Sequence, residues 1–393
     1  MKNKSIIIFL ITSLSVYITI SVFRFSLGIV IPSMEAEFNI STLYQGLLIS
    51  TNLIGALIIS LFTGTISDKI NIDRTIILGT LLMSTAYLLI GYANSYIIII
   101  ILVFVTGVGM GILVPSVYSK MGTILPKHRG LLIGISNTIF TIGGFIGSIT
   151  TALIITSSNW RTPFILYGIY GLIVLILLAS AYRHITKNKD YKININKKYG
   201  SQILSRYKEI SKIKNIIPIT GNMFIGNLSF VTFIAFAPSY FIEIQKLDII
   251  YIGYIMAAFS ISGGLSAILT GRLSDKIGRK NISTIMNVIA LIASGIIFID
   301  LFTNEILIIL AAVFGFGLFP FWNLQISSIQ DAVDDRLIVT ATAYVQNTAW
   351  IGAIVGPALT GYLLLFSSFQ YTMLILTSVV WIIPIVLNLI SRK

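Results

Sequence analysis

Long apolar segments, each about 20 residues in length and almost free of charge, run through nearly the whole chain. The sequence is 56% hydrophobic and 10% charged, whereas about a quarter of the residues of a soluble domain are charged. A helix of about 20 apolar residues spans the hydrocarbon core of a bilayer. We therefore predict an all-α membrane protein with 12 transmembrane helices, at Ile6–Ile31, Leu43–Ile66, Thr75–Ala93, Tyr96–Tyr118, Leu131–Thr156, Thr162–Tyr182, Asn215–Phe241, Ile249–Gly271, Ile282–Ile299, Glu305–Ile329, Leu337–Phe366 and Thr372–Leu389.

The basic residues fall almost entirely at one set of predicted helix ends. Of 27 bases, 24 lie at these ends and in the loop between residues 183 and 214, and only Arg161 and Lys246 lie at the opposite ends. The positive-inside rule then places both termini and this loop in the cytoplasm, with the chain a multi-pass protein of the cell membrane. Because topology explains the net charge of +13, we expect the lipid bilayer, and no nucleic acid, around the chain.

One charged run between two apolar segments has a second, weaker copy. The run Gly271–Lys280 places one acid and four bases in a turn, and the copy begins at Gly64 and continues to Arg74. Asp275 and Asp68 hold the same place in the two copies, 207 residues apart. Similar offsets relate other pairs, which are Gly107-x-Gly109 with Gly315-x-Gly317, Arg129 with Arg336, and Asn137-Thr138 with Asn347-Thr348. The chain therefore reads as two parallel repeats.

The run Gly271–Lys280 resembles the G-x-L-[AS]-D-[RK]-x-G-R-[RK] signature of the major facilitator superfamily. The first copy departs from it, because Asn71 replaces the second glycine and Ile72 and Asp73 replace the basic pair. The resemblance implies two pseudo-symmetric six-helix halves in a secondary active transporter that works by alternating access. The halves would be residues 1–182 and 215–393, joined by a basic cytoplasmic loop over residues 183–214.

The resemblance also implies a set of gating residues at the cytoplasmic rim. In this interpretation Asp275 reaches helix-end amides or Arg279, and Asp68 does the same in the first half. Such exposed contacts are each worth no more than about 1 kcal/mol, which is small enough to be reversed in every transport cycle. The predicted gating residues are Gly64, Asp68, Arg74, Arg129, Gly271, Asp275, Gly278 and Arg279.

One base lies inside a predicted span. Arg24 precedes Pro32 by eight residues, and if Pro32 marks the outer end of the first helix, Arg24 lies about 12 Å inside that end. A guanidinium at this depth usually faces a watery cavity or a partner. Tyr17 and Ser21 share its helix face at spacings of seven and three residues, which suits a wetted wall better than a lipid-facing one.

The acidic residues offer Arg24 no partner within the membrane, because all 14 fall in predicted loops or at helix ends. A guanidinium fork matches carboxylate or phosphate geometry, so we hypothesise that Arg24 binds an anionic substrate. The alternative is that Arg24 reaches the outer interface or ties helices together. Its spacing from Pro32 is similar to that in organic-anion and organophosphate members of the superfamily. Those members often add a base in helix 7, where this chain has Phe230 before Pro238, which favours a monoanion.

Further cavity candidates follow from the resemblance, because helices 1, 4, 7 and 10 line the central path in this superfamily. Buried amides also hold membrane helices together, so a packing role stays open for each of them. The predicted substrate-binding set is Arg24, Tyr17, Ser21, Asn222, Asn227, Trp322, Asn323 and Asn347.

The positions of the ionisable residues also limit how transport could be coupled to an ion and which other functions are possible. Proton-coupled carriers commonly protonate a buried acid, and without one a proton would travel on the substrate or on an acid at a helix end; exchange is equally allowed. Two repeats in one chain make a monomer sufficient. No acid, histidine or cysteine lies at membrane depth, so we expect no enzyme, metal or cofactor. Multidrug efflux, favoured by Gly352-x-x-x-Gly356-Pro357, and a transporter-like sensor are the alternatives.

Overall fold

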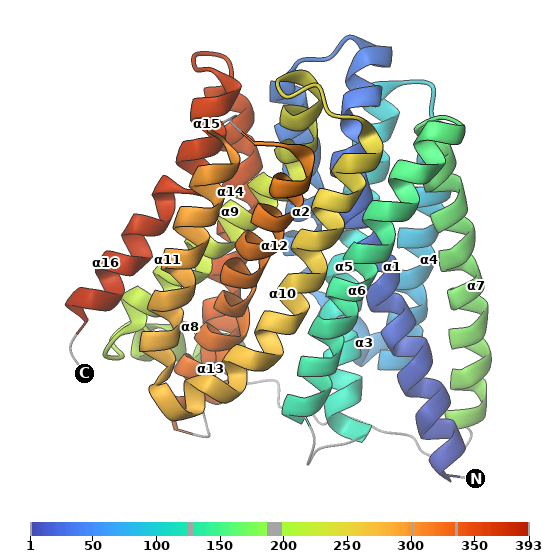
Figure 1. Ribbon diagram of the computed structural model, residues 1–393. Helices are drawn as coiled ribbons and strands as arrows, with labels where there is room; N and C mark the ends of the chain where they lie inside the picture. The colour runs from blue at the N-terminus through green and yellow to red at the C-terminus, as the bar shows by residue number, and fades with distance from the viewer. Residues whose placement is uncertain (1, 125–128, 187–198, 300–301, 335–336, 392–393) are drawn as a thin grey trace. The chain divides into compact units, whose positions relative to one another are not determined.

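The computed structural model is helical throughout the residues it describes, which are 2–124, 129–186, 199–299, 302–334 and 337–391 (Figure 1). The helices in chain order are α1 (Lys2–Phe38), α2 (Thr42–Ser60), α3 (Thr63–Ile70), α4 (Ile72–Ile90), α5 (Tyr96–Ile124), α6 (Arg129–Ser157), α7 (Arg161–Thr186), α8 (Tyr199–Ile210), α9 (Ile216–Glu243), α10 (Ile249–Ile277), α11 (Arg279–Ile297), α12 (Asn304–Leu318), α13 (Pro320–Asp331), α14 (Ile338–Leu363), α15 (Phe369–Thr377), the 3₁₀ turn η2 (Val379–Trp381) and α16 (Ile382–Ile390).

The predicted all-α membrane fold is confirmed. Eleven segments of the described chain are long and apolar enough to cross a membrane, and α14 adds a helix of 26 residues, which agrees with the predicted count of 12. Three predicted spans are interrupted, the second between α2 and α3, the tenth between α12 and α13, and the twelfth at η2. The tenth breaks where Pro320 starts a new helix, because proline has no amide hydrogen and suits a first turn.

The first helix is longer than predicted. α1 continues through Pro32 to Phe38, so Pro32 does not mark its end. A proline inside a helix removes one backbone hydrogen bond, and neighbouring helices in a membrane protein can accommodate that loss. Arg24 therefore lies 14 residues from the end of α1, or about 21 Å along its axis, which is deeper than the sequence indicated.

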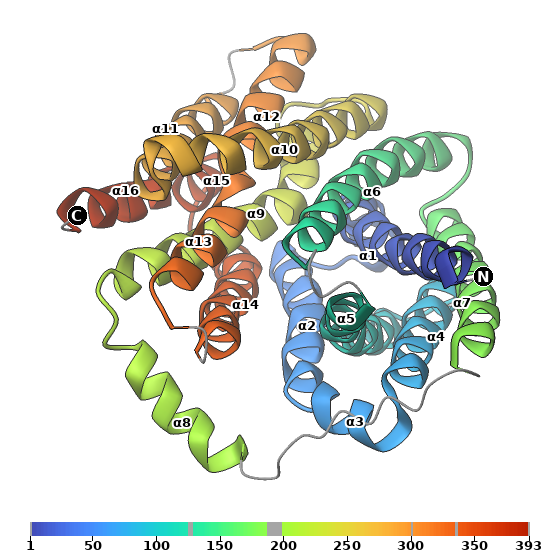
Figure 2. The ribbon, with the colours of Figure 1, turned by 90° about the horizontal axis from the view of Figure 1, so that it is seen from below.

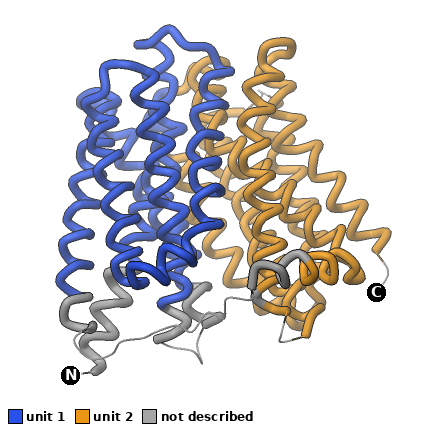
Figure 3. Tube along the Cα trace, turned by 180° about the vertical axis from the view of Figure 1, so that it is seen from behind, with its two compact units in different colours: residues 1–193, 248–253 blue, residues 194–247, 254–393 orange. Residues whose placement is uncertain are grey.

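The chain divides into two compact units (Figure 3). Unit 1 comprises residues 1–193 and 248–253, and unit 2 comprises residues 194–247 and 254–393. The division falls inside the predicted middle loop, part of which forms α8. The six-helix halves with boundaries at 182 and 215 stay a prediction.

Within unit 1, α1 packs against α6 and α7, while α5 packs against α2 and α4 (Figure 2). Within unit 2, α9 packs against α14, α15 and α13, and α11 packs against α12. Residues 225–241 of α9 are all buried, which makes α9 the central helix of its unit in the same way that α1 is largely buried in unit 1.

The glycines of the repeat show that the two units pack alike at equivalent positions. A Cβ atom on Gly107 of α5 would lie 1.9 Å from the carbonyl oxygen of Asn52, and one on Gly315 of α12 would lie 2.0 Å from that of Phe259. Asn52 and Phe259 are themselves 207 residues apart. Because only glycine fits where backbones approach so closely, the paired glycines report the same helix contact in each unit.

Candidate functional site

Arg24 occupies the middle of α1 and is the one side chain between residues 19 and 31 that is not fully buried. Its neighbours Phe23 and Phe25 are both buried. Tyr87 of α4 interacts electrostatically with Arg24. A base in a membrane helix usually faces a watery cavity or a polar partner. The partial exposure of Arg24 is compatible with the predicted substrate contact, which stays a prediction.

The other faces of α1 are used for packing. The Ser21 hydroxyl donates to the carbonyl oxygen of Phe140 on α6, and Ser26 accepts from the Thr151 hydroxyl of the same helix at 2.6 Å. On the opposite side, the Phe23 ring stacks on Tyr87 with centroids 3.9 Å apart. Ser21, a predicted substrate-binding residue, thus lies on the face that contacts α6.

Tyr17 lies two helical turns before Arg24 and on the same face, and it meets polar residues of two other helices. Its ring centroid is 5.5 Å from that of Tyr118 on α5. The Tyr118 hydroxyl in turn donates to Oδ1 of Asn137 on α6 at 3.4 Å. Both Tyr118 and Asn137 are partly exposed. The structure therefore brings residues of α1, α5 and α6 together near Arg24's face of the helix.

Asn222, a predicted substrate-binding residue, belongs instead to a buried polar network in unit 2. Its Oδ1 accepts from Ser283 at 3.1 Å and from Asn287 Nδ2 at 2.7 Å, and its Nδ2 donates to Asn388 Oδ1 at 3.0 Å. Gln325 Nε2 donates to Ser283 at 2.9 Å. All five side chains are buried. This neutral network joins α9, α11, α13 and α16, which is the packing role that the sequence left open for buried amides.

The remaining unit 2 candidates are placed differently from one another. Asn227 is buried, and its Nδ2 donates to the Met223 carbonyl of its own helix at 3.3 Å. Trp322 and Asn323 on α13 are both half-buried. Asn347 on α14 donates from Nδ2 to the Tyr207 hydroxyl of α8 at 3.0 Å. The partners given above for Asn227 and Asn347 lie outside the predicted substrate-binding set, and the substrate role of all four residues stays a prediction.

The predicted gating run of unit 2 forms a turn whose strongest contact is with a residue outside the run. Gly278, at φ 96°, precedes the first residue of α11. Arg279 lies 3.7 Å from Asp275, but its Nε donates directly to Asp331 at the end of α13. Gly271 has open space where a Cβ would lie. The expected partner Asp275 is therefore the weaker of two acids that share Arg279.

The first copy of the run keeps the same backbone shape with different chemistry. Asn71 has φ 78° and precedes α4 as Gly278 precedes α11, so an asparagine supplies the positive φ that glycine usually provides. Gly64, Asp68 and Arg74 are exposed. Arg129 is the first residue of α6, and its side chain lies outside the described ones.

A largely buried ion pair joins this first copy to α5. Asp73, at the start of α4, lies 2.7 Å from Lys120 near the end of α5, and the side chains are only 5% and 14% exposed. Asp73 was identified from the sequence only as a departure from the basic pair, and its partner Lys120 was not predicted. An acid at a helix start is favourable by itself, so its presence does not indicate which base lies beside it.

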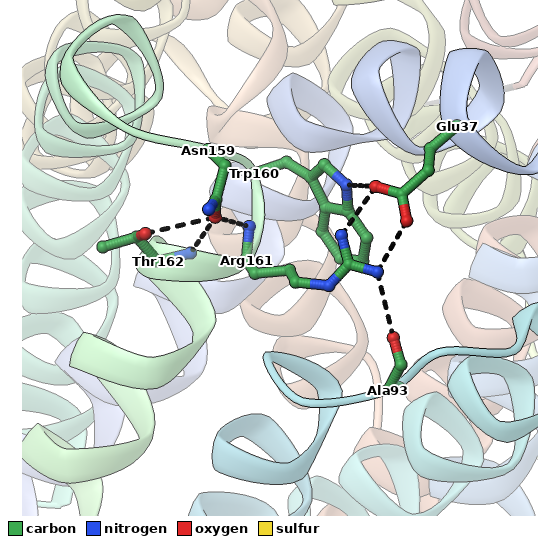
Figure 4. A network of polar contacts seen from close by, with 6 residues as sticks. All are labelled: Glu37, Ala93, Asn159, Trp160, Arg161 and Thr162. Atoms are coloured by element: carbon green, nitrogen blue, oxygen red, sulfur yellow. Dashed lines mark hydrogen bonds and ion pairs between the residues drawn. The ribbon is translucent and has the colours of Figure 1, made fainter.

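A second network closes the other end of unit 1 (Figure 4). Both oxygens of Glu37, in the last turn of α1, accept from the Arg161 guanidinium at 2.6 Å, and Trp160 Nε1 donates to Oε2 at 2.7 Å. Arg161 also donates to the Ala93 carbonyl at 3.2 Å. This network ties the ends of α1, α4 and α7, and it too escaped the sequence analysis, because Glu37 fell outside the predicted first span.

The comparisons with known proteins decide the family. The sequence profile described as Major Facilitator Superfamily matches residues 13–357 and 252–392. The chain belongs to this superfamily. The resemblance drawn from Gly271–Lys280 is therefore confirmed.

Relatives of the chain within the superfamily are carriers. A hexuronate transporter of Bacillus subtilis is 24% identical over 355 residues, covering 86% of this chain and 83% of its own. A cis,cis-muconate transport protein of Acinetobacter baylyi is 23% identical over 350 residues, covering 84% and 81%. A solved nucleoside transporter superposes with a TM-score of 0.82 at 12% identity over 98% of this chain and 99% of its own.

This chain is thus a multi-pass membrane transporter of small solutes. The relatives and the solved structures that it resembles are transporters rather than enzymes. The named relatives carry organic acids, so the multidrug-efflux alternative gains no support.

Proposed function

We propose that this transporter carries small organic monoanions and that Arg24 binds their carboxylate. The observation that carries the proposal is the partial exposure of Arg24 inside a stretch of α1 that is otherwise buried. A guanidinium in a membrane interior is stabilised by an anion that takes two parallel hydrogen bonds. Two relatives are named for organic acids, hexuronate and cis,cis-muconate. Hexuronate carries one carboxylate and supports the monoanion, whereas muconate carries two and supports only the broader class of organic anions.

A single charge at this site favours a monoanion over a phosphate ester. The position equivalent to Arg24 before Pro238 of α9 is Phe230, whose ring is packed 5.3 Å from Phe319 and 6.2 Å from Phe259. A doubly charged head group would need a second base, and unit 2 offers aromatic packing at the matching place.

The orientation and the mechanism belong to the same proposal. The excess of bases at one set of helix ends supports a cell-membrane protein with both termini in the cytoplasm. The two six-helix halves would alternate access to the site, and the ion pairs Asp73–Lys120 and Arg279–Asp331 would stabilise the state in which their end of each half is closed. A monomer is sufficient for this cycle.

Counterflow in proteoliposomes tests the proposed function. Vesicles loaded with an unlabelled organic acid should accumulate the labelled acid when they contain wild-type protein. Arg24→Ala should lose the carboxylate contact and reduce the rate at least about ten-fold, since hydrogen bonds to charged groups contribute about 1.5–3 kcal/mol. Arg24→Lys keeps the charge without the fork and should fall between the two. Wild-type rates in Arg24→Ala for every acid would refute the assignment.

A further inference from the structure

A second polar point lies along the same face of unit 1 as Arg24. Tyr17 precedes Arg24 by seven residues, which places the two on one face of α1, about 10 Å apart along the axis. Tyr17 contacts Tyr118, and Tyr118 contacts Asn137. The helices α1, α5 and α6 that carry these residues pack against one another within unit 1 (Figure 2). The guanidinium and the Tyr118–Asn137 pair are therefore two poles along the same face of α1, about two helical turns apart.

The Tyr118–Asn137 pair has the chemistry to bind a ligand hydroxyl. Its hydroxyl-to-oxygen separation of 3.4 Å is longer than the 2.5–3.0 Å that is usual for such bonds. A phenolic hydroxyl both donates and accepts, and an amide offers an acceptor and two donors. Both side chains are partly exposed. A ligand hydroxyl that reached this pair could accept from the Tyr118 hydroxyl and donate to Oδ1 of Asn137.

The surface between the two poles is aromatic. The rings of Tyr17 and Tyr118 are 5.5 Å apart and inclined by 48°, and Tyr17 is buried while Tyr118 is only partly so. Aromatic rings pack against one another edge-to-face or offset-stacked at centroid distances of about 4.5–7 Å, and the partly exposed Tyr118 ring can offer such a contact to a ligand ring. This surface suits the planar body of an unsaturated or aromatic acid.

The positions of unit 2 that match Tyr118 and Asn137 do not form a corresponding pair. Asn347, the counterpart of Asn137, makes a bond of 3.0 Å to Tyr207 of α8. Gln325, which is 207 residues after Tyr118, is buried in the polar network around Asn222. The long, partly exposed tyrosine–asparagine pair is thus a feature of unit 1, where Arg24 lies.

Resting on the proposed function, we infer that the anion site of unit 1 selects elongated monocarboxylates, in which a flat body separates the carboxylate on Arg24 from a hydroxyl bound by Tyr118 and Asn137. A compact two-carbon acid would occupy only the Arg24 pole. Tyr118 and Asn137 are then the specificity-determining residues of the carrier.

The test compares two ring acids that differ by one hydroxyl. Dissociation constants of benzoate and 4-hydroxybenzoate are measured on the purified full-length protein by ligand-dependent thermal shift. The variants are Tyr118→Phe, which removes only the hydroxyl, Asn137→Ala and Arg24→Ala. Tyr167→Phe is the matched control, because its hydroxyl bonds Thr150 and Thr151 at 2.7 and 2.8 Å, away from the proposed pole.

We expect wild type and Tyr167→Phe to bind 4-hydroxybenzoate about five-fold more tightly than benzoate, the ratio that one hydrogen bond of about 1 kcal/mol gives. That ratio should fall to about one in Tyr118→Phe and Asn137→Ala, with benzoate binding retained. An unchanged ratio in both variants, no preference in wild type, or binding of neither ring acid would overturn the inference. A hexuronate, tested on wild type and Arg24→Ala in the same assay, separates the two proposals. Its binding to wild type and loss in Arg24→Ala would uphold the proposed function in each of those cases, whereas equal binding to both proteins would refute the proposed function.

Discussion

The two units place opposite chemistry at equivalent positions. Arg24 precedes Pro32 by the same eight residues by which Phe230 precedes Pro238, yet Arg24 keeps partial exposure and Phe230 is packed among aromatic rings. Elsewhere the paired glycines show the same helix contacts in both units. A duplicated scaffold has therefore kept its backbone packing while unit 1 holds the charge and unit 2 holds the apolar core.

The ends of the units show the same divergence. In unit 1 an acid at the start of α4 pairs with a base on α5, whereas in unit 2 a base at the start of α11 pairs with an acid on α13. The sign is reversed and so is the burial, since Asp73 is 5% exposed and Asp331 is 60% exposed. At the other end, Arg161 and its counterpart Gln370 both donate to a carbonyl, of Ala93 and Phe298. In both units, polar contacts link the helices at each end, but the charges of the residues that make these contacts differ.

The largest predicted effect tests whether the more buried of the two ion pairs contributes more to stability. Asp73→Asn removes the charge of the buried carboxylate that pairs with the largely covered Lys120 and should lower the free energy of unfolding by about 3 kcal/mol. Asp331→Asn removes an exposed pair and should cost about 1 kcal/mol or less. Unfolding of both variants in detergent, followed by circular dichroism, measures the difference. Equal losses would show that burial does not separate the two pairs.

The second prediction concerns the buried amides of unit 2. Asn222→Ala leaves the groups of Ser283, Asn287 and Asn388 without their partner and should cost about 2 kcal/mol. Asn227→Ala is the matched control on the same helix, because the Asn227 amide donates to the Met223 carbonyl of its own helix at 3.3 Å. This variant should cost about half as much. The same unfolding assay applies. A larger loss in Asn227→Ala would point to a ligand or packing role that the network account lacks.

The third prediction, of a smaller effect, concerns the two turn residues with positive φ, Gly278 and Asn71. Gly278→Ala places a side chain at φ 96° and should destabilise the protein by about 1 kcal/mol, because L residues rarely adopt this conformation. Asn71→Gly relieves the strain at φ 78° but removes the cap to the Asp73 amide at 3.2 Å, so it should change stability by less than about 0.5 kcal/mol. The melting temperatures of the two variants, compared with that of wild type, test whether position 278 requires glycine while position 71 accepts either glycine or asparagine. A tolerated alanine at 278 contradicts this account of the turn.

The smallest prediction separates the paired asparagines. Tyr207→Phe removes the hydroxyl that Asn347 binds and should cost about 0.5–1 kcal/mol. Burial raises the pKa of Tyr207 above its usual value. Because the Tyr207 oxygen accepts this bond from Asn347, and a phenolic oxygen accepts in either protonation state, the bond should persist as the pH rises. A double-mutant cycle with Asn347→Ala measures the coupling. Additive losses would mean that α8 is not held on α14 through this bond.

The sequence predicted the fold well because period, length and charge placement act over whole segments. The helix pattern and the repeat offset near 207 were recognisable although most predicted helix boundaries differ from the observed ones by some residues. The pairs Asp73–Lys120 and Glu37–Arg161 were missed because they join residues 47 and 124 positions apart, and no local pattern shows which ends meet. Ser21 and Asn222 were chosen correctly as polar residues inside spans, but residue type alone does not show whether a neighbour on the next helix uses the polar group for packing.

The most direct measurement of the central claim is a ligand-dependent thermal shift on purified protein, with wild type beside Arg24→Ala and Arg24→Lys. The panel holds organic monocarboxylates, phosphate esters, inorganic anions and lipophilic compounds at equal concentration. The account predicts that a monocarboxylate raises the melting temperature of wild type, less so of Arg24→Lys and not at all of Arg24→Ala. Equal stabilisation of all three proteins, or stabilisation by neutral lipophilic compounds alone, would contradict it.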